Sequence, residues 1–213
     1  MIRPISSLTL ALALVTPAVL AGPTASPSAD QLKPYLQVKT VEGDEFRVRA
    51  FFSPSCSFSK QYFPFFVNLS KTLPEDKQFA FTPVVNKADG LSYAFAFAAV
   101  QRFYPRYVSN VVQASLQGVQ DMGLSTRSWF GIERIGRAAG VPVPLARLVQ
   151  DNLPALRPDV DQLIQLQSRL KITNTPSVAV AGTYIVTPEF TGGNSDQFST
   201  LVNAVVSMTT LHE

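Results

Sequence analysis

The chain of 213 residues contains one cysteine, Cys56, and one histidine, His212. A single cysteine cannot form an internal disulfide, so its thiol is buried and inert, bonded to another molecule, or reactive. One histidine beside the C-terminus can supply neither a histidine-based metal cluster nor a Ser-His-Asp triad. We therefore expect no metal and no cofactor and exclude most hydrolases, and the surroundings of Cys56 have to decide what its thiol does.

The residues around Cys56 indicate a strand followed by a helix. Residues 46–52 (FRVRAFF) alternate apolar and basic side chains before becoming wholly apolar, which is typical of a strand entering a sheet interior. After Ser53-Pro54-Ser55, aromatic and apolar residues recur at helical spacing, which predicts a helix burying one face: Phe58, Tyr62, Phe65, Phe66 and Leu69. Cys56 would then lie at a helix N-terminus.

A helix N-terminus favours a thiolate, because unpaired backbone N–H groups and the positive end of the helix dipole face it. Ser59 lies three residues further on, in the same turn, and could donate its hydroxyl proton to the sulfur. The alternative is a structural cysteine packed at the strand–helix junction, with Ser59 as a solvated neighbour. The residues alone leave both interpretations open.

The remaining elements follow from periodicity and breakers. A second strand is expected near residues 78–85, interrupted at Pro83, and residues 91–156 have the composition of three or four helices without strands. Pro158 is expected to open a longer amphipathic helix. Two short strands joined around Ala181-Gly182 and a closing helix over residues 196–208 complete the chain.

The N-terminus predicts export. Residues 1–21 combine a basic residue, a short apolar run and small residues before Gly22, which is the pattern of a signal peptide, and residues 22–35 indicate a flexible lead-in. The apolar run is too short to span a bilayer, so we expect no stable membrane insertion after cleavage. The net charge of +3 comes without a dense Lys/Arg run, which argues against nucleic-acid binding.

Two segments resemble a known family. Phe51-Phe52-Ser53-Pro54-Ser55-Cys56-Ser57-Phe58-Ser59 is similar to the active-site segment of the periplasmic DsbA-like thiol–disulfide oxidoreductases. Thr175-Pro176, followed by residues 177–184, resembles the substrate-binding loop of that family, where a cis-proline faces the active-site sulfur. The resemblance implies an α/β protein: a thioredoxin fold with an inserted helical domain. Residues 36–90 would form its first half, residues 91–156 the insertion, and residues 157–213 a connecting helix and the second half.

The resemblance also assigns roles to single positions, with losses. Cys56 matches the nucleophile, while Ser59 replaces the resolving cysteine of Cys-x-x-Cys, and both are candidate catalytic residues. Phe58 replaces a histidine that stabilises the thiolate, and Ala50 replaces a buried glutamate. The candidate substrate-binding residues are Ser57, Phe58, Thr175 and Pro176.

These losses imply an altered mechanism. Without a second thiol the chain has no disulfide to donate and cannot clear a mixed disulfide by itself. We expect monothiol, isomerase- or reductase-like work in the periplasm on disulfide-containing or unfolded exported proteins. The alternative is a redox-inactive peptide-binding or chaperone-like module. Thiol transfer with glutathione is a third hypothesis, which export into a glutathione-poor compartment disfavours.

Overall fold

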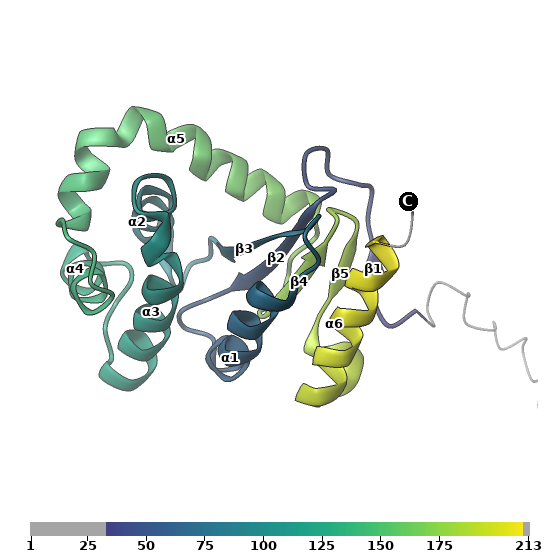
Figure 1. Ribbon diagram of the computed structural model, residues 1–213. Coiled ribbons are helices and arrows are strands. Elements are labelled where there is room, and N and C mark those ends of the chain that lie inside the picture. The colour runs from purple at the N-terminus through teal and green to yellow at the C-terminus, as the bar shows by residue number, and fades with distance from the viewer. Residues whose placement is uncertain (1–32, 211–213) are drawn as a thin grey trace, which may run out of the picture. The chain divides into compact units, whose positions relative to one another are not determined.

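Five strands form one mixed sheet (Figure 1). This computed structural model describes residues 33–210, and residues from Pro34 onward cluster as one unit. The strands are β1 (Leu36–Gln37), β2 (Arg47–Phe52), β3 (Gln78–Pro83), β4 (Ser177–Val180) and β5 (Tyr184–Val186), in the order β1-β5-β4-β2-β3. Only the β2–β3 pair is parallel. The predicted signal peptide and most of the predicted lead-in lie outside the described residues.

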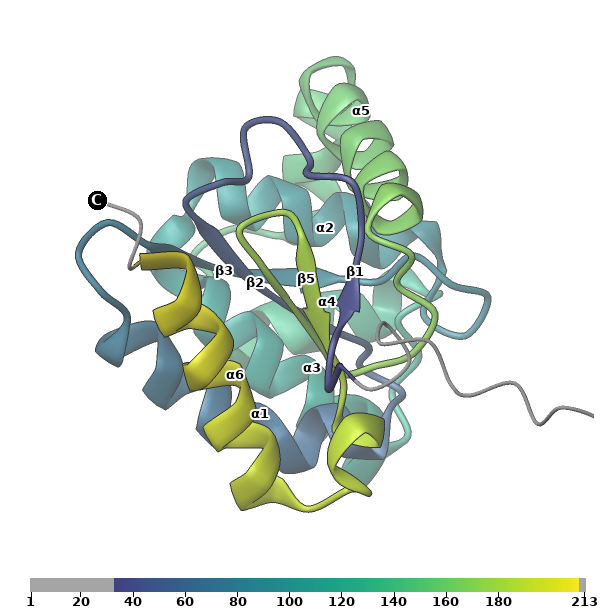
Figure 2. The ribbon, with the colours of Figure 1, turned by 90° about the vertical axis from the view of Figure 1, so that its right-hand side faces the viewer.

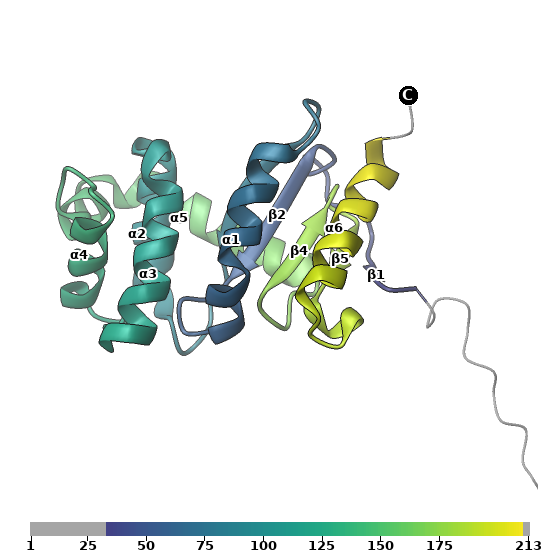
Figure 3. The same cartoon turned by 60° about the horizontal axis from the view of Figure 1, so that its bottom comes forward.

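Helices cover both faces of the sheet, as Figures 2 and 3 show. Helices α1 (Ser57–Thr72) and α6 (Ser195–Thr210) pack on one face, and the C-terminal half of α5 (Leu145–Arg169) packs on the other. Successive side chains of a strand point to opposite faces, so Phe51 and Phe52 pack against helices on different sides of the sheet. Phe52 joins the larger core with Tyr62 of α1, and Phe51 joins a smaller core with Leu166 of α5.

The segment between β3 and α5 is helical, as predicted. It contains α2 (Gly90–Phe103), the 3-10 turn η2 (Pro105–Tyr107), α3 (Val108–Met122) and α4 (Trp129–Ala138). These helices pack beside the β3 edge of the sheet (Figure 1), with α2 against α5 and α3 against α1. Strands, a helical insertion and returning strands in this order confirm the predicted α/β class.

One predicted boundary is wrong: no helix begins at Pro158. Helix α5 is continuous from Leu145 to Arg169 and contains both Pro154 and Pro158. The prolines lie four residues apart on the exposed side of the helix, where water can reach the carbonyls that lose their N–H partners. Buried Leu156 and Val160 hold the helix on the other side, and α5 arches over this stretch instead of ending (Figure 1).

The β4–β5 hairpin turns at Ala181 and Gly182, the position that the sequence predicts. Both residues have positive φ angles, +52° for Ala181 and +61° for Gly182. A Cβ atom on Gly182 would come within 2.9 Å of Asp44 Cβ and of Val41 O, so glycine is required there by space as well as by conformation.

None of the helices in the described part of the chain is long and apolar enough to cross a membrane.

Candidate functional site

Cys56 lies at the N-cap position of α1, four residues after the end of β2. Its backbone is extended, with φ of −91° and ψ of +118°, and its N–H donates to Ser53 O at 3.0 Å. The side chain is partly exposed, and the first turn of α1 contains no acidic residue. The sulfur therefore stands at the open positive end of a sixteen-residue helix.

The cis-proline loop, Asn174–Ser177, packs directly against this sulfur. Cys56 Sγ donates to the backbone carbonyl of Thr175 at 3.1 Å, across a sequence separation of 119 residues. The Thr175–Pro176 peptide bond is cis, the geometry that the resemblance implied. Pro176 is buried and Thr175 is half-buried, while Ser177 Oγ donates to Asn174 O at 2.6 Å and closes the loop. The two motifs singled out in the sequence thus meet at one point.

Ser59 is buried beneath this turn. Its hydroxyl oxygen accepts a hydrogen bond from the Ser53 N–H at 3.2 Å, which ties the first turn of α1 to the end of β2. Among the described residues no hydrogen bond joins Ser59 to Cys56. In this structure, where the Cys56 sulfur is a thiol, Ser59 supports the loop. The expected hydrogen bond from Ser59 to the sulfur stays a prediction, and it concerns the thiolate form.

Ser57 and Phe58 are exposed beside the sulfur. The Phe58 side chain is 53% exposed, so it does not belong to the buried face of α1, where the sequence placed it. That face consists of Ser59, Tyr62, Phe66 and Leu69. Phe58 lies off that face, since its neighbour Ser59 in the same turn is the buried one. A large exposed aromatic ring next to a thiol suits contact with another chain.

Asp89, which the sequence analysis did not single out, anchors the loop before Cys56. Its carboxylate is 1% exposed and accepts hydrogen bonds from the Ser53 hydroxyl at 2.5 Å, the Ser55 N–H at 3.2 Å and the Asn86 side-chain amide at 3.0 Å. Asp89 stands at the N-cap of α2 but does not cap that helix with its side chain. The only sequence signal at this position is residues 86–90 (NKADG), which indicate the start of a helix. They could not show that the Asp89 carboxylate turns away from that helix toward the Cys56 loop.

The helical insertion supplies a second anchor through α3. Gln120 donates its side-chain amide to the carbonyls of Pro54 and Cys56, both at 2.9 Å. One residue further, Asp121 pairs with Lys60 of α1. These contacts tie the Cys56 backbone and α1 to the helical insertion, and no local pattern in the sequence predicts them.

The site contains few titratable groups. Ala50 is fully buried in the apolar core, so the position of the family's glutamate holds no proton acceptor here. Within residues 33–210 no cluster of three or more His, Cys, Asp or Glu side chains could hold a metal ion. The chemistry available at the site is that of one thiol between a helix N-terminus and a backbone carbonyl.

The two protonation states of Cys56 have different partners. The thiol uses its proton to bond Thr175 O, and a thiolate loses that bond. The thiolate gains instead from the N–H groups of the first turn of α1, which have no acceptor within the helix. In the structure the sulfur is a thiol that donates to the Thr175 carbonyl at the N-terminus of α1.

Comparison with known proteins supports the architecture. No protein-family model matches the chain, and no curated protein sequence matches it. Among solved structures, Pseudomonas aeruginosa DsbA is similar with a TM-score of 0.70 and 16% sequence identity, over 84% of this chain and 95% of that one. The oxidoreductase DsbA from Xylella fastidiosa gives 0.67 and 16%, over 82% and 94%.

A third similar structure is a complex of Proteus mirabilis DsbA with a non-covalently bound peptide, PWATCDS. Its TM-score is 0.67 at 20% identity, over 83% of this chain and 95% of that one. At these identities the likeness concerns the backbone, and the site residues stand on the geometry given above. The chain has the fold of the DsbA proteins, a thioredoxin fold with an inserted helical domain.

Proposed function

We propose that this protein is an exported, periplasmic thiol–disulfide interchange protein that works through the single thiol of Cys56. Its clients are disulfide-containing or unfolded exported proteins, and it needs neither a metal nor a stable membrane insertion. The observation that carries the proposal is the position of the partly exposed Cys56 sulfur at the N-cap of α1, next to the cis-proline loop. This places a partly exposed nucleophile beside a backbone carbonyl that an extended client segment can use.

The reaction proceeds by two thiolate exchanges. The Cys56 thiolate attacks one sulfur of a client disulfide, forming a Cys56–client disulfide and releasing the other client sulfur as a thiolate, which takes up a proton. A further client thiolate then attacks the client sulfur of the mixed disulfide, forms a new client disulfide and returns the Cys56 thiolate. No net oxidation occurs, so the chain needs no second cysteine and no oxidant for isomerisation.

The neighbouring residues bind the client and steady the sulfur. Thr175 offers backbone hydrogen bonds to an extended segment next to Pro176, as a strand edge does. Ser57 and Phe58, both exposed, contact the side chains that flank the client cysteine. Ser59 has a hydroxyl proton that no described partner accepts, and it donates that proton to the thiolate once Cys56 ionises.

The direct test uses a client with scrambled disulfides, such as scrambled ribonuclease, and the reduced protein in the absence of other thiols. We expect recovery of client activity and a mixed disulfide of protein plus client in acid-quenched samples analysed by intact mass. The Cys56→Ala variant controls for folding assistance without chemistry. A wild-type protein that neither forms the adduct nor exceeds Cys56→Ala in recovered activity would refute the proposal.

Replacing Ser59 tests both the lost resolving cysteine and the thiolate contact. Ser59→Cys creates a dithiol that, once oxidised, should oxidise a reduced client, which the wild-type chain cannot do. Ser59→Ala should slow alkylation of Cys56 at neutral pH relative to wild type, whereas Ser57→Ala, an exposed neighbour, should not. Equal alkylation rates for wild type and Ser59→Ala over pH 6 to 9 would remove Ser59 from the mechanism.

A second function, a redox-inactive peptide-binding module, is favoured by one observation. The hydrogen bond from Cys56 to Thr175 O stabilises the protonated sulfur, which is the unreactive form. Under this hypothesis alkylation of Cys56 is slow at every pH, and Cys56→Ala binds extended peptides as tightly as wild type. Rapid alkylation at neutral pH together with a client adduct would exclude the binding module.

A further inference from the structure

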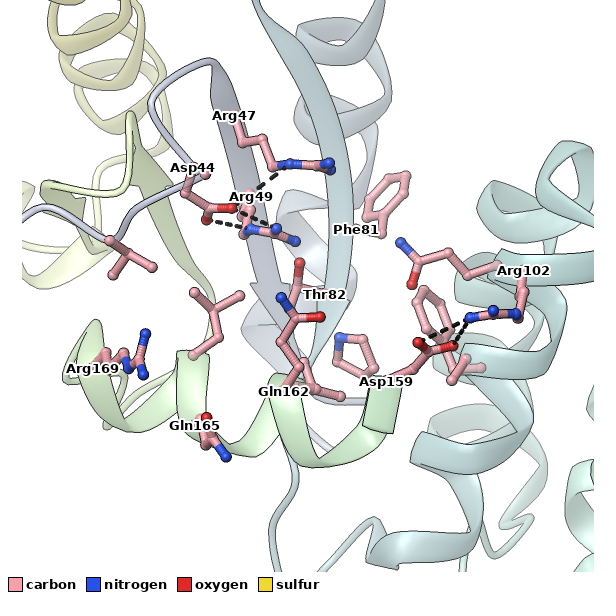
Figure 4. Close-up of a pocket in the computed structure, with 18 of the residues that line it drawn as sticks. Asp44, Arg47, Arg49, Phe81, Thr82, Arg102, Asp159, Gln162, Gln165 and Arg169 are labelled. Carbon is pink, nitrogen blue, oxygen red and sulfur yellow. Dashed lines mark hydrogen bonds and ion pairs between the residues drawn. The ribbon is translucent and has the colours of Figure 1, made fainter. Parts of the chain in front are cut away.

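A cavity of about 400 Å³ lies on the α5 side of the sheet, across the sheet from α1. Figure 4 shows its polar lining, with Arg47 and Arg49 on β2, Thr82 on β3, Arg102 on α2 and Gln162 on α5. The loop over residues 41–44 and the apolar Leu163 and Leu166 of α5 complete the walls. Its volume falls in the range of small-molecule sites, toward the small end. The residues around Cys56 take no part in it.

The charges that line this cavity do not cancel. Arg49 is paired with Asp44 through two hydrogen bonds, and Arg102 is paired with Asp159 in the same way. Arg47 shares Asp44 at 3.7 Å, although Arg49 already occupies both oxygens of that carboxylate.

Arg169 has no ion-pair partner within residues 33–210, and Glu42, exposed at the rim, has none either. Four arginines thus face three carboxylates, which leaves one surplus positive charge. Histidine is absent from the lining, so that surplus stays constant over the neutral pH range.

Thr82 provides an independent indication of a ligand. Its residue is 3% exposed, and its hydroxyl is the one buried side-chain polar atom in the described part of the chain that has no hydrogen-bond partner. Buried hydroxyl groups in native proteins are nearly always paired, so the orphan needs a partner that the protein itself does not supply. Thr82 itself lines the cavity, so a molecule bound there lies next to this residue.

We infer that this cavity binds a small organic carboxylate with an apolar body, the class to which N-acylated amino acids and short peptide C-termini belong. The carboxylate bonds the guanidinium group of Arg169, which has no ion-pair partner in the described residues, and the surplus positive charge of the lining offsets its charge. The Thr82 hydroxyl gains its missing partner, and the aliphatic part of the ligand packs on Leu163 and Leu166. This site is separate from Cys56 and does not depend on thiol–disulfide chemistry.

The test is titration of the full chain with N-acetyl-L-phenylalanine, in which binding is measured by calorimetry and by chemical-shift changes of the backbone amides. We expect saturable binding that shifts the amides of β3 and of the C-terminal half of α5. The neutral N-acetyl-L-phenylalaninamide should bind at least about tenfold more weakly, since a charged hydrogen bond is lost.

Variants separate the site from general charge effects. Arg169→Gln and Thr82→Val should each weaken binding about three- to tenfold. Arg147→Gln removes the same charge from the same helix, at an 80% exposed side chain outside the cavity, and should change affinity less than twofold. Thr82→Val also removes an unsatisfied hydroxyl without changing shape, so the variant should unfold at no lower temperature than wild type.

Three results would overturn the inference. The first is no saturable binding of N-acetyl-L-phenylalanine up to about 20 mM, beyond the weakest affinity that a site of this size would give. The second is equal affinity for the carboxylate and the carboxamide. The third is evidence that the binding lies elsewhere, given either by equal weakening in Arg169→Gln and Arg147→Gln or by amide shifts confined to the first turn of α1.

Discussion

Asp89 offers the sharpest test of how the Cys56 loop is held. The Asp89→Asn variant keeps the size of the side chain but replaces one acceptor oxygen by an NH₂ group. Three donors converge on the native carboxylate, from Ser53, Ser55 and Asn86, and one amide oxygen cannot satisfy all of them. At least one partly buried donor, the Ser55 N–H or the Asn86 amide, therefore loses its acceptor and faces an N–H group instead.

The expected cost follows from this count. A buried donor left without an acceptor costs about 1–3 kcal/mol. A neutral amide costs less to bury than a carboxylate, and this difference offsets part of the cost if a second hydrogen bond is lost. We expect Asp89→Asn to lower the free energy of unfolding by about 1–3 kcal/mol, with a fall in melting temperature of about 2–4 °C per kcal/mol for a chain of this size. The accessibility of Cys56 to alkylation should also change, since the freed loop carries it.

Urea unfolding followed by far-UV circular dichroism measures the first effect, and iodoacetamide kinetics measures the second. Asp121→Asn is the matched control, because Asp121 is exposed and its ion pair with Lys60 also links α1 to the insertion. An exposed pair contributes at most about 1 kcal/mol, so the control should unfold close to wild type. Equal stabilities of Asp89→Asn and wild type, or of the two variants, would refute the reasoning.

Three further predictions concern one support of the Cys56 loop, one buried tyrosine and one turn. Gln120→Leu removes the side-chain donor of the Pro54 carbonyl and leaves the Cys56 carbonyl with only the 3.4 Å bond from Lys60 N–H, so it should speed hydrogen exchange in the first turn of α1 while costing about 1–2 kcal/mol; unchanged exchange would contradict this. Burial holds the pKa of Tyr93 well above its usual value, so stability should fall as pH rises above about 10, where unfolded tyrosine ionises, and Tyr93→Phe should remove part of that fall in alkaline denaturation curves. Gly182→Ala adds a steric clash to an unfavourable φ angle and should cost more than Gly192→Ala, whose φ of +58° is similar but whose surroundings are open; equal melting temperatures would show that the contact at Gly182 relaxes freely.

The local elements were predictable because their signals are local. Alternation in β2, aromatic spacing in α1 and the Ala-Gly turn of the β4–β5 hairpin each lie within a window of a few residues. The error at Pro158 has the same origin. A proline normally marks a helix boundary, and only the packing of buried neighbours on α5 lets the helix continue through it.

The sequence by itself determined where thiol chemistry could occur: Cys56 is the one cysteine of the chain, and its place before an amphipathic helix follows from spacing alone. Only the tertiary structure decided what surrounds that sulfur. Asp89, Gln120 and Thr175 reach the Cys56 loop from three elements far apart in the chain, and Phe58 stays outside the core. The physical reason is that a hydrogen bond depends on distances of about 3 Å and on direction, and these are fixed by how helices and strands pack rather than by residue order.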